Sequence, residues 1–242
     1  FISSLIYSFH DYNLFRTATF SGLSNYKKIL GDPLIMKAFI QTFKYAFLTV
    51  PLELIFALFI AYILNFKIKG VNFFRTAYYI PSILGGSVSI AVLWRFLFKT
   101  EGLVNMIASR FGIQPFNWLG DPGGAFWVIV FLKIWQFGSP MIIFLAAIKQ
   151  VPQEMLEAAA IDGASKFQRT IRIMLPMISP IILFNLIMQI ISAFKVFTES
   201  YIISGGNGGV LDSLLFYTLH IYNEGFGKMR MGYASALAWF LV

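Results

Sequence analysis

The chain has 242 residues, of which 58% are hydrophobic and 18% aromatic, while only 12% are charged. A soluble domain carries about a quarter charged residues, so this composition indicates a protein that folds in a lipid membrane. The net charge of +8 would suggest nucleic acid as the partner of a soluble protein. Here the basic residues flank apolar runs, so anchoring at the membrane edge explains them and no nucleic acid is expected. The absence of cysteine excludes disulfides and thiolate chemistry, and two distant histidines argue against a histidine metal site.

Six apolar segments follow one another along the chain. A spanning helix needs about 20 mainly apolar residues. We predict four complete spans and parts of two more: 1–9 (partial), Tyr45–Leu64, Thr76–Trp94, Ala125–Ile148, Ile173–Phe194 and 231–242 (partial). None of these runs alternates with period two, which argues against a membrane barrel. The fold predicted for 1–242 is therefore a single all-α polytopic membrane domain with a six-helix core. We expect its first and last helices to be truncated parts of a longer chain.

The basic residues also predict the orientation. The short loops 65–75, with Lys67, Lys69 and Arg75, and 149–172 hold seven of the 19 Lys and Arg residues within 35 positions. The longer loops of the other face hold eleven within roughly 100 positions. The number of Lys and Arg residues favours the longer loops as cytoplasmic, whereas their density favours the short ones. The positive-inside rule applies best to short loops near helix ends. We therefore predict that residues 149–172 are cytoplasmic.

The most polar helix-forming segment is Val151–Pro180, between the fourth and fifth spans. Residues 153–160 are mostly strong helix formers, and Gly163 supplies the permissive backbone that ends a helix. A second, basic amphipathic segment is predicted over Ser165–Ile173, closed by Leu175-Pro176. A helix of about ten residues is marginal alone in water and must pack on something. A groove in a partner protein and the lipid head groups are equal alternatives from helix physics alone.

The same segment resembles the EAA–G–I-x-LP signature of permease subunits in ABC importers that use a solute-binding protein. Every fixed position matches at the right spacing: Glu157, Ala158, Ala159, Gly163, Ile173, Leu175 and Pro176. Other segments resemble the carbohydrate-uptake branch, in particular its MalF/UgpA-like member: NFFRTAYYIPSILGGSVSIAVLWRFLF (72–98), NWLGDP (117–122), AFKVFTESYIISGGNGG (193–209) and GYASALAW (232–239). The resemblance spans nearly the whole chain.

This resemblance implies a multi-pass permease of the bacterial inner membrane, forming half of a heterodimeric pathway with a second permease subunit. An extracytoplasmic solute-binding protein would deliver a sugar or oligosaccharide, and two separate ATPase subunits would drive import. The coupling helix would lie within 151–176, and the seven signature residues would dock on the ATPase. The chain has no G-x-x-x-x-G-K-[ST] motif, so ATP and Mg are expected in the ATPase, with no cofactor and no enzyme activity in this chain.

Polar side chains inside the spans are candidate solute-pathway residues. Asn185, Gln189 and Ser192 share one face of the fifth span, and Trp135 and Gln136 lie in the fourth. The alternative is that these groups hydrogen-bond to neighbouring helices. Two further polar residues, Glu53 and Lys133, are ionisable groups inside spans, which makes them functional candidates without an assigned role.

Other functions stay open. The same machinery could carry glycerol phosphate or another small polar solute, although a phosphate favours arginines facing the pathway and the centre of the fifth span is uncharged. An ion-driven secondary transporter would need paired acids or broken helices at mid-membrane, and only Glu53 is available. An intramembrane enzyme would need a nucleophile–base pair, and no credible pair is found.

Overall fold

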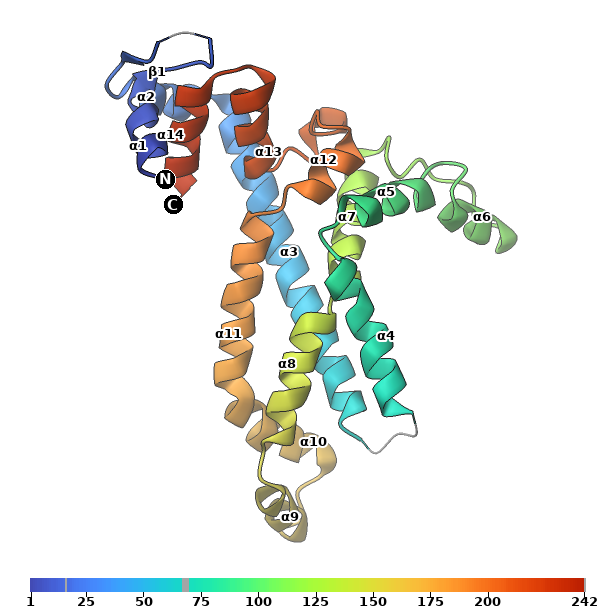
Figure 1. Ribbon diagram of the computed structural model, residues 1–242. Helices are drawn as coiled ribbons and strands as arrows, with labels where there is room; N and C mark the ends of the chain where they lie inside the picture. Colours follow the sequence, from blue (N-terminus) through green and yellow to red (C-terminus); the bar gives the residue numbers. More distant parts are fainter. Residues whose placement is uncertain (16, 67–69, 242) are drawn as a thin grey trace. The chain divides into compact units, whose positions relative to one another are not determined.

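The computed structural model describes residues 1–15, 17–66 and 70–241 (Figure 1). Lys67 and Lys69 of the predicted basic loop, and the last residue of the sixth predicted span, lie outside this part. The regular secondary structure of the described chain is helical apart from one short antiparallel pair, β1 (His10–Asp11) with β2 (Thr19–Phe20), which confirms the all-α prediction. It divides into two compact units: Phe1–Tyr45 with Gly86–Ile129 and Phe194–Val242, and Ala46–Gly85 with Val130–Ala193.

Three helical segments of the described chain are long and apolar enough to cross a membrane: Pro33–Leu64, Pro122–Lys149 and Lys166–Phe194. The first is helix α3, the second joins α7 (Pro122–Trp135) to α8 (Gly138–Lys149), and the third ends in α11 (Leu175–Phe194). The predicted second span is thus the later part of a longer helix. It begins earlier because Ile35 and Ala38 of its first turns are buried in a core.

The third predicted span, Thr76–Trp94, is two helices rather than one. Helix α4 (Val71–Leu84) stops before Gly85-Gly86, and α5 (Val88–Leu97) begins after Ser87. Gly86 has φ +79°, a left-handed backbone that glycine adopts freely. The Ser87 hydroxyl then accepts a hydrogen bond from the Ile90 amide and caps α5. Backbone conformation therefore interrupts a run that is apolar throughout.

The first unit is built around a cluster of buried side chains from α2 (Ser24–Gly31), α3, α13 (Tyr217–Tyr222), α14 (Met231–Leu241) and the residues before α13: Ile29, Ile35, Ala38, Leu215, Tyr217, Leu219, Tyr233, Ala236 and Leu237. The Tyr217 hydroxyl donates to the Leu237 carbonyl at 2.7 Å. Helix α1 (Ile2–Ser8) packs on α14, where the Trp239 indole donates to Ser4 Oγ at 3.0 Å. This unit also contains α6 (Leu103–Arg110), α12 (Thr198–Ser204), η2 (Val210–Asp212) and η3 (Asn223–Gly227).

The second unit is fastened by a close approach of α4 to α8. A Cβ atom at Gly138 would lie 2.2 Å from the Tyr78 carbonyl oxygen, so only glycine fits there. The Ser82 hydroxyl donates to the Gln136 carbonyl at 2.5 Å and accepts from the Ser139 amide at 2.9 Å. These contacts hold the start of α8 against α4.

A continuous helical segment leads from the polar region into the fifth span. Helix α10 (Lys166–Arg169) passes through η1 (Thr170–Met174), a wide π-helical turn, directly into α11. The prediction that Leu175-Pro176 closes the segment is therefore wrong. Proline lacks the N–H that an α-helix needs, but the π turn shifts the bonding so that the Leu175 amide reaches Thr170 O. The helix accommodates Pro176 at its widened turn.

Candidate functional site

Helix α9 (Gln153–Ile161) is the short helix predicted between the fourth and fifth spans, and it has no buried residue. Gly163 follows it with φ +84°, and the Ala164 amide returns to the Ala159 carbonyl at 2.9 Å. Nothing lies within 4 Å of a Cβ built at Gly163, so the position demands glycine for its backbone and not for space. The prediction that Gly163 ends this helix is confirmed.

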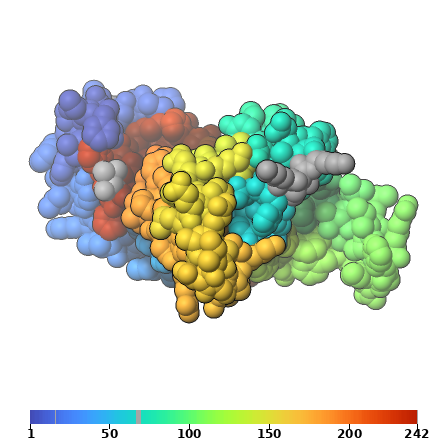
Figure 2. Space-filling view, turned by 90° about the horizontal axis from the view of Figure 1, so that it is seen from below, coloured from blue at the N-terminus to red at the C-terminus, as the bar shows by residue number. Residues whose placement is uncertain are grey.

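Apolar side chains are exposed on and beside α9. Met155 is 48% exposed, Ile161 87% and Phe167 72%. In the view from below, the surface of this segment, drawn yellow to orange, faces the reader (Figure 2). Of the signature residues, Glu157, Ala158 and Gly163 are exposed and Ala159 is half-buried. Exposed apolar groups gathered around a polar helix are typical of a surface that another protein or a membrane covers.

Three contacts order the segment that contains α9 and α10, and one of them reaches a spanning helix. Arg169 Nη1 donates to the Leu156 carbonyl of α9 at 3.2 Å. Ser165 and Gln168 form a reciprocal capping box at the start of α10. Thr170 Oγ1 donates to Tyr62 Oη, near the end of α3, at 3.3 Å. A cleft of about 330 Å³ beside these contacts is lined by Tyr62, Phe66, Leu156, Glu157, Lys166 and Arg169, among others.

The remaining signature residues do not lie on α9. Ile173 belongs to η1, and Leu175 and Pro176 form the first turn of α11. Ile173 and Leu175 are half-buried, and Pro176 is exposed. The signature residues thus fall into two groups. The first lies on or just after the exposed helix α9, and the second lies where η1 continues into the fifth span.

A polar cluster inside the second unit joins α3, α7 and α11. Lys133 Nζ lies 3.4 Å from Glu53 Oε2, and the two side chains are 14% and 1% exposed. The same ammonium donates to Gln189 Oε1 at 2.9 Å and reaches Ser192 Oγ at 3.5 Å. Two predicted solute-pathway residues therefore meet at a lysine whose role the sequence left unassigned.

The other predicted solute-pathway residues lie elsewhere. Asn185 is buried, and its amide donates to the Ile181 carbonyl of its own helix at 3.1 Å. Trp135 and Gln136 are half-buried at the end of α7. Gln136 Nε2 is buried without a hydrogen-bond partner in the described part of the chain. Within that part, no group of three or more His, Asp or Glu side chains is placed to hold a metal ion.

Sequence reasoning missed two contacts, the Glu53–Lys133 ion pair and the Arg169 hydrogen bond to α9. Opposite charges at Glu53 and Lys133 inside two spans are a signal that could have paired them, because an isolated charge in lipid is costly. The Arg169 contact has no such signal, since its acceptor is a backbone carbonyl.

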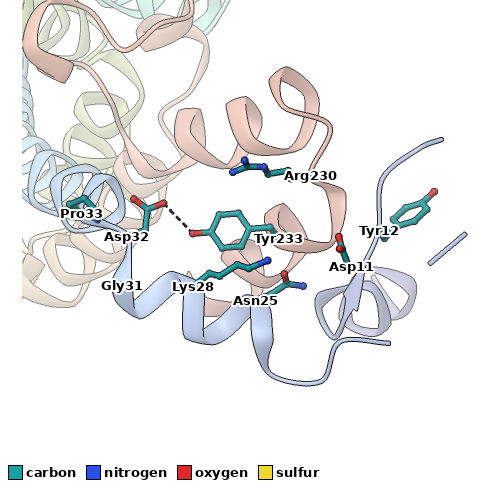
Figure 3. Close-up of a pocket in the computed structure, with 9 residues that line it drawn as sticks. All are labelled: Asp11, Tyr12, Asn25, Lys28, Gly31, Asp32, Pro33, Arg230 and Tyr233. Carbon is teal, nitrogen blue, oxygen red and sulfur yellow. Dashed lines mark hydrogen bonds between the residues drawn. The ribbon is translucent and has the colours of Figure 1, made fainter. Parts of the chain in front are cut away.

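The first unit contains a separate cavity of about 680 Å³ next to the start of α3 (Figure 3). The Tyr233 hydroxyl points at Asp32 and donates to Oδ2 at 3.2 Å, while Lys28 and Arg230 line the same space. Nearby, burial lowers the pKa of the His220 imidazole, against the opposing effect of the Glu224 carboxylate. The cavity is polar with mixed charges and belongs to none of the predicted site residues.

Comparison with known proteins identifies the family. Residues 29–242 match the model of "Binding-protein-dependent transport system inner membrane component". The chain is 47% identical to the probable ABC transporter permease protein YesP of Bacillus subtilis, over 99% of this chain and 78% of the relative. It is 35% identical to the trehalose/maltose transport system permease protein MalF of Thermococcus litoralis, over 92% and 76%.

A solved structure shows the same fold. A chain of the bacterial alginate ABC transporter, in complex with an alginate pentasaccharide-bound periplasmic protein, superimposes with a TM-score of 0.79. The match covers 90% of this chain and 77% of that one, at 22% identity. The family match over most of the chain and the close relatives agree: the chain belongs to the inner membrane components of binding-protein-dependent transport systems.

Proposed function

We propose that the chain is one of two permease subunits of a heterodimeric ABC importer for a sugar or oligosaccharide. A solute-binding protein delivers the sugar on the outer face, and two separate ATPase subunits bind and hydrolyse ATP with Mg on the cytoplasmic face, where residues 149–172 lie. Relatives named for trehalose/maltose, lactose and arabinooligosaccharide transport support the substrate class.

The observation that carries the proposal is the exposed helix α9. Arg169 hydrogen-bonds to its Leu156 carbonyl, and the left-handed Gly163 follows its last turn. A nine-residue helix without buried side chains is only marginally stable in water, and a partner that covers it would stabilise it. Glu157, Ala158, Ala159 and Gly163 form the docking contact in this proposal, while Ile173, Leu175 and Pro176 carry its motion into α11. A groove in the ATPase fits the exposed apolar side chains better than lipid head groups do, because the carboxylate of Glu157 would face anionic lipid.

The contacts of the second unit supply a physical route from docking to solute. Arg169 joins α9 to α10, α10 continues through η1 into α11, and α11 carries Gln189 to Lys133. The 14 residue steps from Leu175 to Gln189 correspond to about 21 Å of helix. We assign Gln189 and Ser192 to the solute pathway. Asn185, Trp135 and Gln136 also remain proposed pathway residues, and the Asn185 amide donates to the Ile181 carbonyl of its own helix.

One alternative substrate has a specific observation behind it. The chain is 30% identical to the sn-glycerol-3-phosphate transport system permease protein UgpA of Pectobacterium atrosepticum. An anionic phosphate would favour cationic partners, and the cationic Lys133 is already matched by Glu53. A sugar therefore fits the neutral cluster better.

Docking is tested with Glu157→Lys and Gly163→Val in the assembled importer. Both variants should abolish uptake and co-purification of the ATPase, because one reverses the charge of the docking face and the other forces a side chain into a left-handed backbone. Glu101→Lys, an exposed acid outside the docking segment, and Gly31→Ala, where a Cβ meets open space, are controls that should retain both. Normal uptake and co-purification in Glu157→Lys and Gly163→Val would contradict the docking role.

Substrate class is tested with a panel of labelled solutes: maltose, trehalose, lactose, an arabinooligosaccharide and sn-glycerol 3-phosphate. Proteoliposomes with the whole importer and its binding protein should take up at least one sugar of the panel. Uptake of the phosphate alone would replace the sugar with the alternative, and uptake of none would contradict the proposed substrate class.

A further inference from the structure

We propose that Lys133, held in place by Glu53, fixes the side-chain amide of Gln189 so that its NH2 group faces the solute. The inference rests on the proposed function, because it assumes that Gln189 lines the pathway. In this proposal Lys133 and Glu53 are positioning residues, and the wall of the pathway presents hydrogen-bond donors to the solute.

The stability of the fold does not by itself explain the ion pair between Glu53 and Lys133. Glu53 is 1% exposed, and the Lys133 side chain 14%. Removing two charges from water costs several kcal/mol per ion, and apolar replacements of buried pairs are often equally stable. Ionisable groups within spans therefore point to function. Glu53 balances the charge of Lys133 and leaves the cluster neutral as a whole.

The chemistry of the ammonium group settles the orientation of the amide. A lysine ammonium has three donors and no acceptor, so only the oxygen of Gln189 can face it. Lys133 Nζ lies 2.9 Å from Gln189 Oε1 accordingly. Nε2 is on the other branch of the amide and makes no hydrogen bond within the described part of the chain. Because Gln189 is only half-buried, this NH2 group is accessible.

Ser192 follows the same logic. Its Oγ lies 3.5 Å from Lys133 Nζ, so the hydroxyl oxygen faces the ammonium and its hydrogen turns elsewhere. Ser192 is exposed on α11. The cluster thus presents hydrogen-bond donors: the NH2 of Gln189 and the O–H of Ser192. A wall of donors selects solutes rich in acceptor oxygens, such as the hydroxyl, ring and glycosidic oxygens of a saccharide.

Gln189→Glu tests the inference, because it keeps an oxygen for Lys133 and removes the NH2 donor. The KM for uptake of the transported panel sugar should rise about three- to tenfold, the effect of losing one hydrogen bond, while the maximal rate changes little. Gln150→Glu, at the exposed end of α8, is the matched control and should leave KM unchanged. A defect of folding alone would lower the maximal rate and the yield of assembled importer without raising KM.

The double variant Glu53→Gln/Lys133→Met tests the positioning role without leaving a buried charge unpaired. It frees the amide to turn, so KM should again rise about threefold or more. Adding Gln189→Met to this pair should raise KM no further than Gln189→Met does alone, since all three act through one group. Unchanged KM in either Gln189→Glu or the double variant overturns the inference, whereas absence of all sugar uptake by the unaltered importer would instead contradict the proposed function.

Discussion

At the scale of single residues, Arg169 is the side chain that ties the docking helix to the rest of its unit. Its guanidinium donates from Nη1 to the Leu156 carbonyl, and its Nε is buried without a partner among the residues that the structure describes. A hydrogen bond from a charged donor contributes about 1.5–3 kcal/mol. Its removal leaves α9 without this hydrogen bond to α10.

We expect Arg169→Met to weaken the coupling between ATP hydrolysis and uptake. A loosened α9 still docks but transmits less of the ATPase motion to α11, so the number of ATP molecules hydrolysed per sugar imported should rise at least twofold. Arg169→Lys should recover part of the coupling, and Arg172→Met, an exposed arginine one helical turn away, should have no effect. An unchanged ATP-to-sugar ratio in Arg169→Met would show that other contacts transmit the motion.

At the scale of secondary-structure elements, the start of α10 depends on its capping box. Ser165 Oγ accepts from the Gln168 amide at 3.3 Å, and Gln168 Oε1 accepts from the Ser165 amide at 2.8 Å. Replacing an N-cap serine by alanine costs about 1 kcal/mol. We expect Ser165→Ala to speed proteolytic cleavage between Asp162 and Gln168 about fivefold in the isolated permease, and Ser165→Asp, an equally good cap, to restore resistance. Equal cleavage of all three proteins would mean that the box does not order the segment.

Local rules predicted some elements and missed others for identifiable reasons. The end of α9 at Gly163 was predictable because a left-handed glycine acts within one turn of chain. The break at Gly85–Ser87 was not, since an uncharged run shows apolar length but not backbone conformation. The continuity through Pro176 was missed because the proline rule assumes α-helical bonding, whereas the π turn changes the partner of the Leu175 amide.

The solute cluster shows the corresponding limit for sites. Helical spacing placed Gln189 and Ser192 on one face, and the structure confirms that both approach the same group. The group itself, Lys133, lies 56 residues earlier than Gln189. No local pattern connects positions so far apart. The opposite charges of Glu53 and Lys133 within two spans were the one sequence signal. They indicate an ion pair but do not predict that Lys133 contacts Gln189 and Ser192.

At the scale of the whole molecule, the proposed mechanism requires α9 and the loop after α5 to face opposite sides of the membrane. Chain order gives this result: between residues 101 and 150 the chain contains one spanning segment, Pro122–Lys149. By the positive-inside rule, we propose that the shorter and more densely basic loop, 149–172, lies in the cytoplasm. The two positions must therefore differ in their access to a reagent that cannot cross the bilayer.

The chain has no cysteine, so one introduced thiol reports its own location without background. Glu101→Cys and Gln150→Cys both replace exposed side chains. In spheroplasts that express the permease without its ATPase, a membrane-impermeant maleimide should label Glu101→Cys and leave Gln150→Cys unlabelled. Detergent should make both reactive, which excludes a buried thiol as the cause. Labelling of Gln150→Cys alone before detergent would invert the topology, and α9 could then not meet a cytoplasmic ATPase.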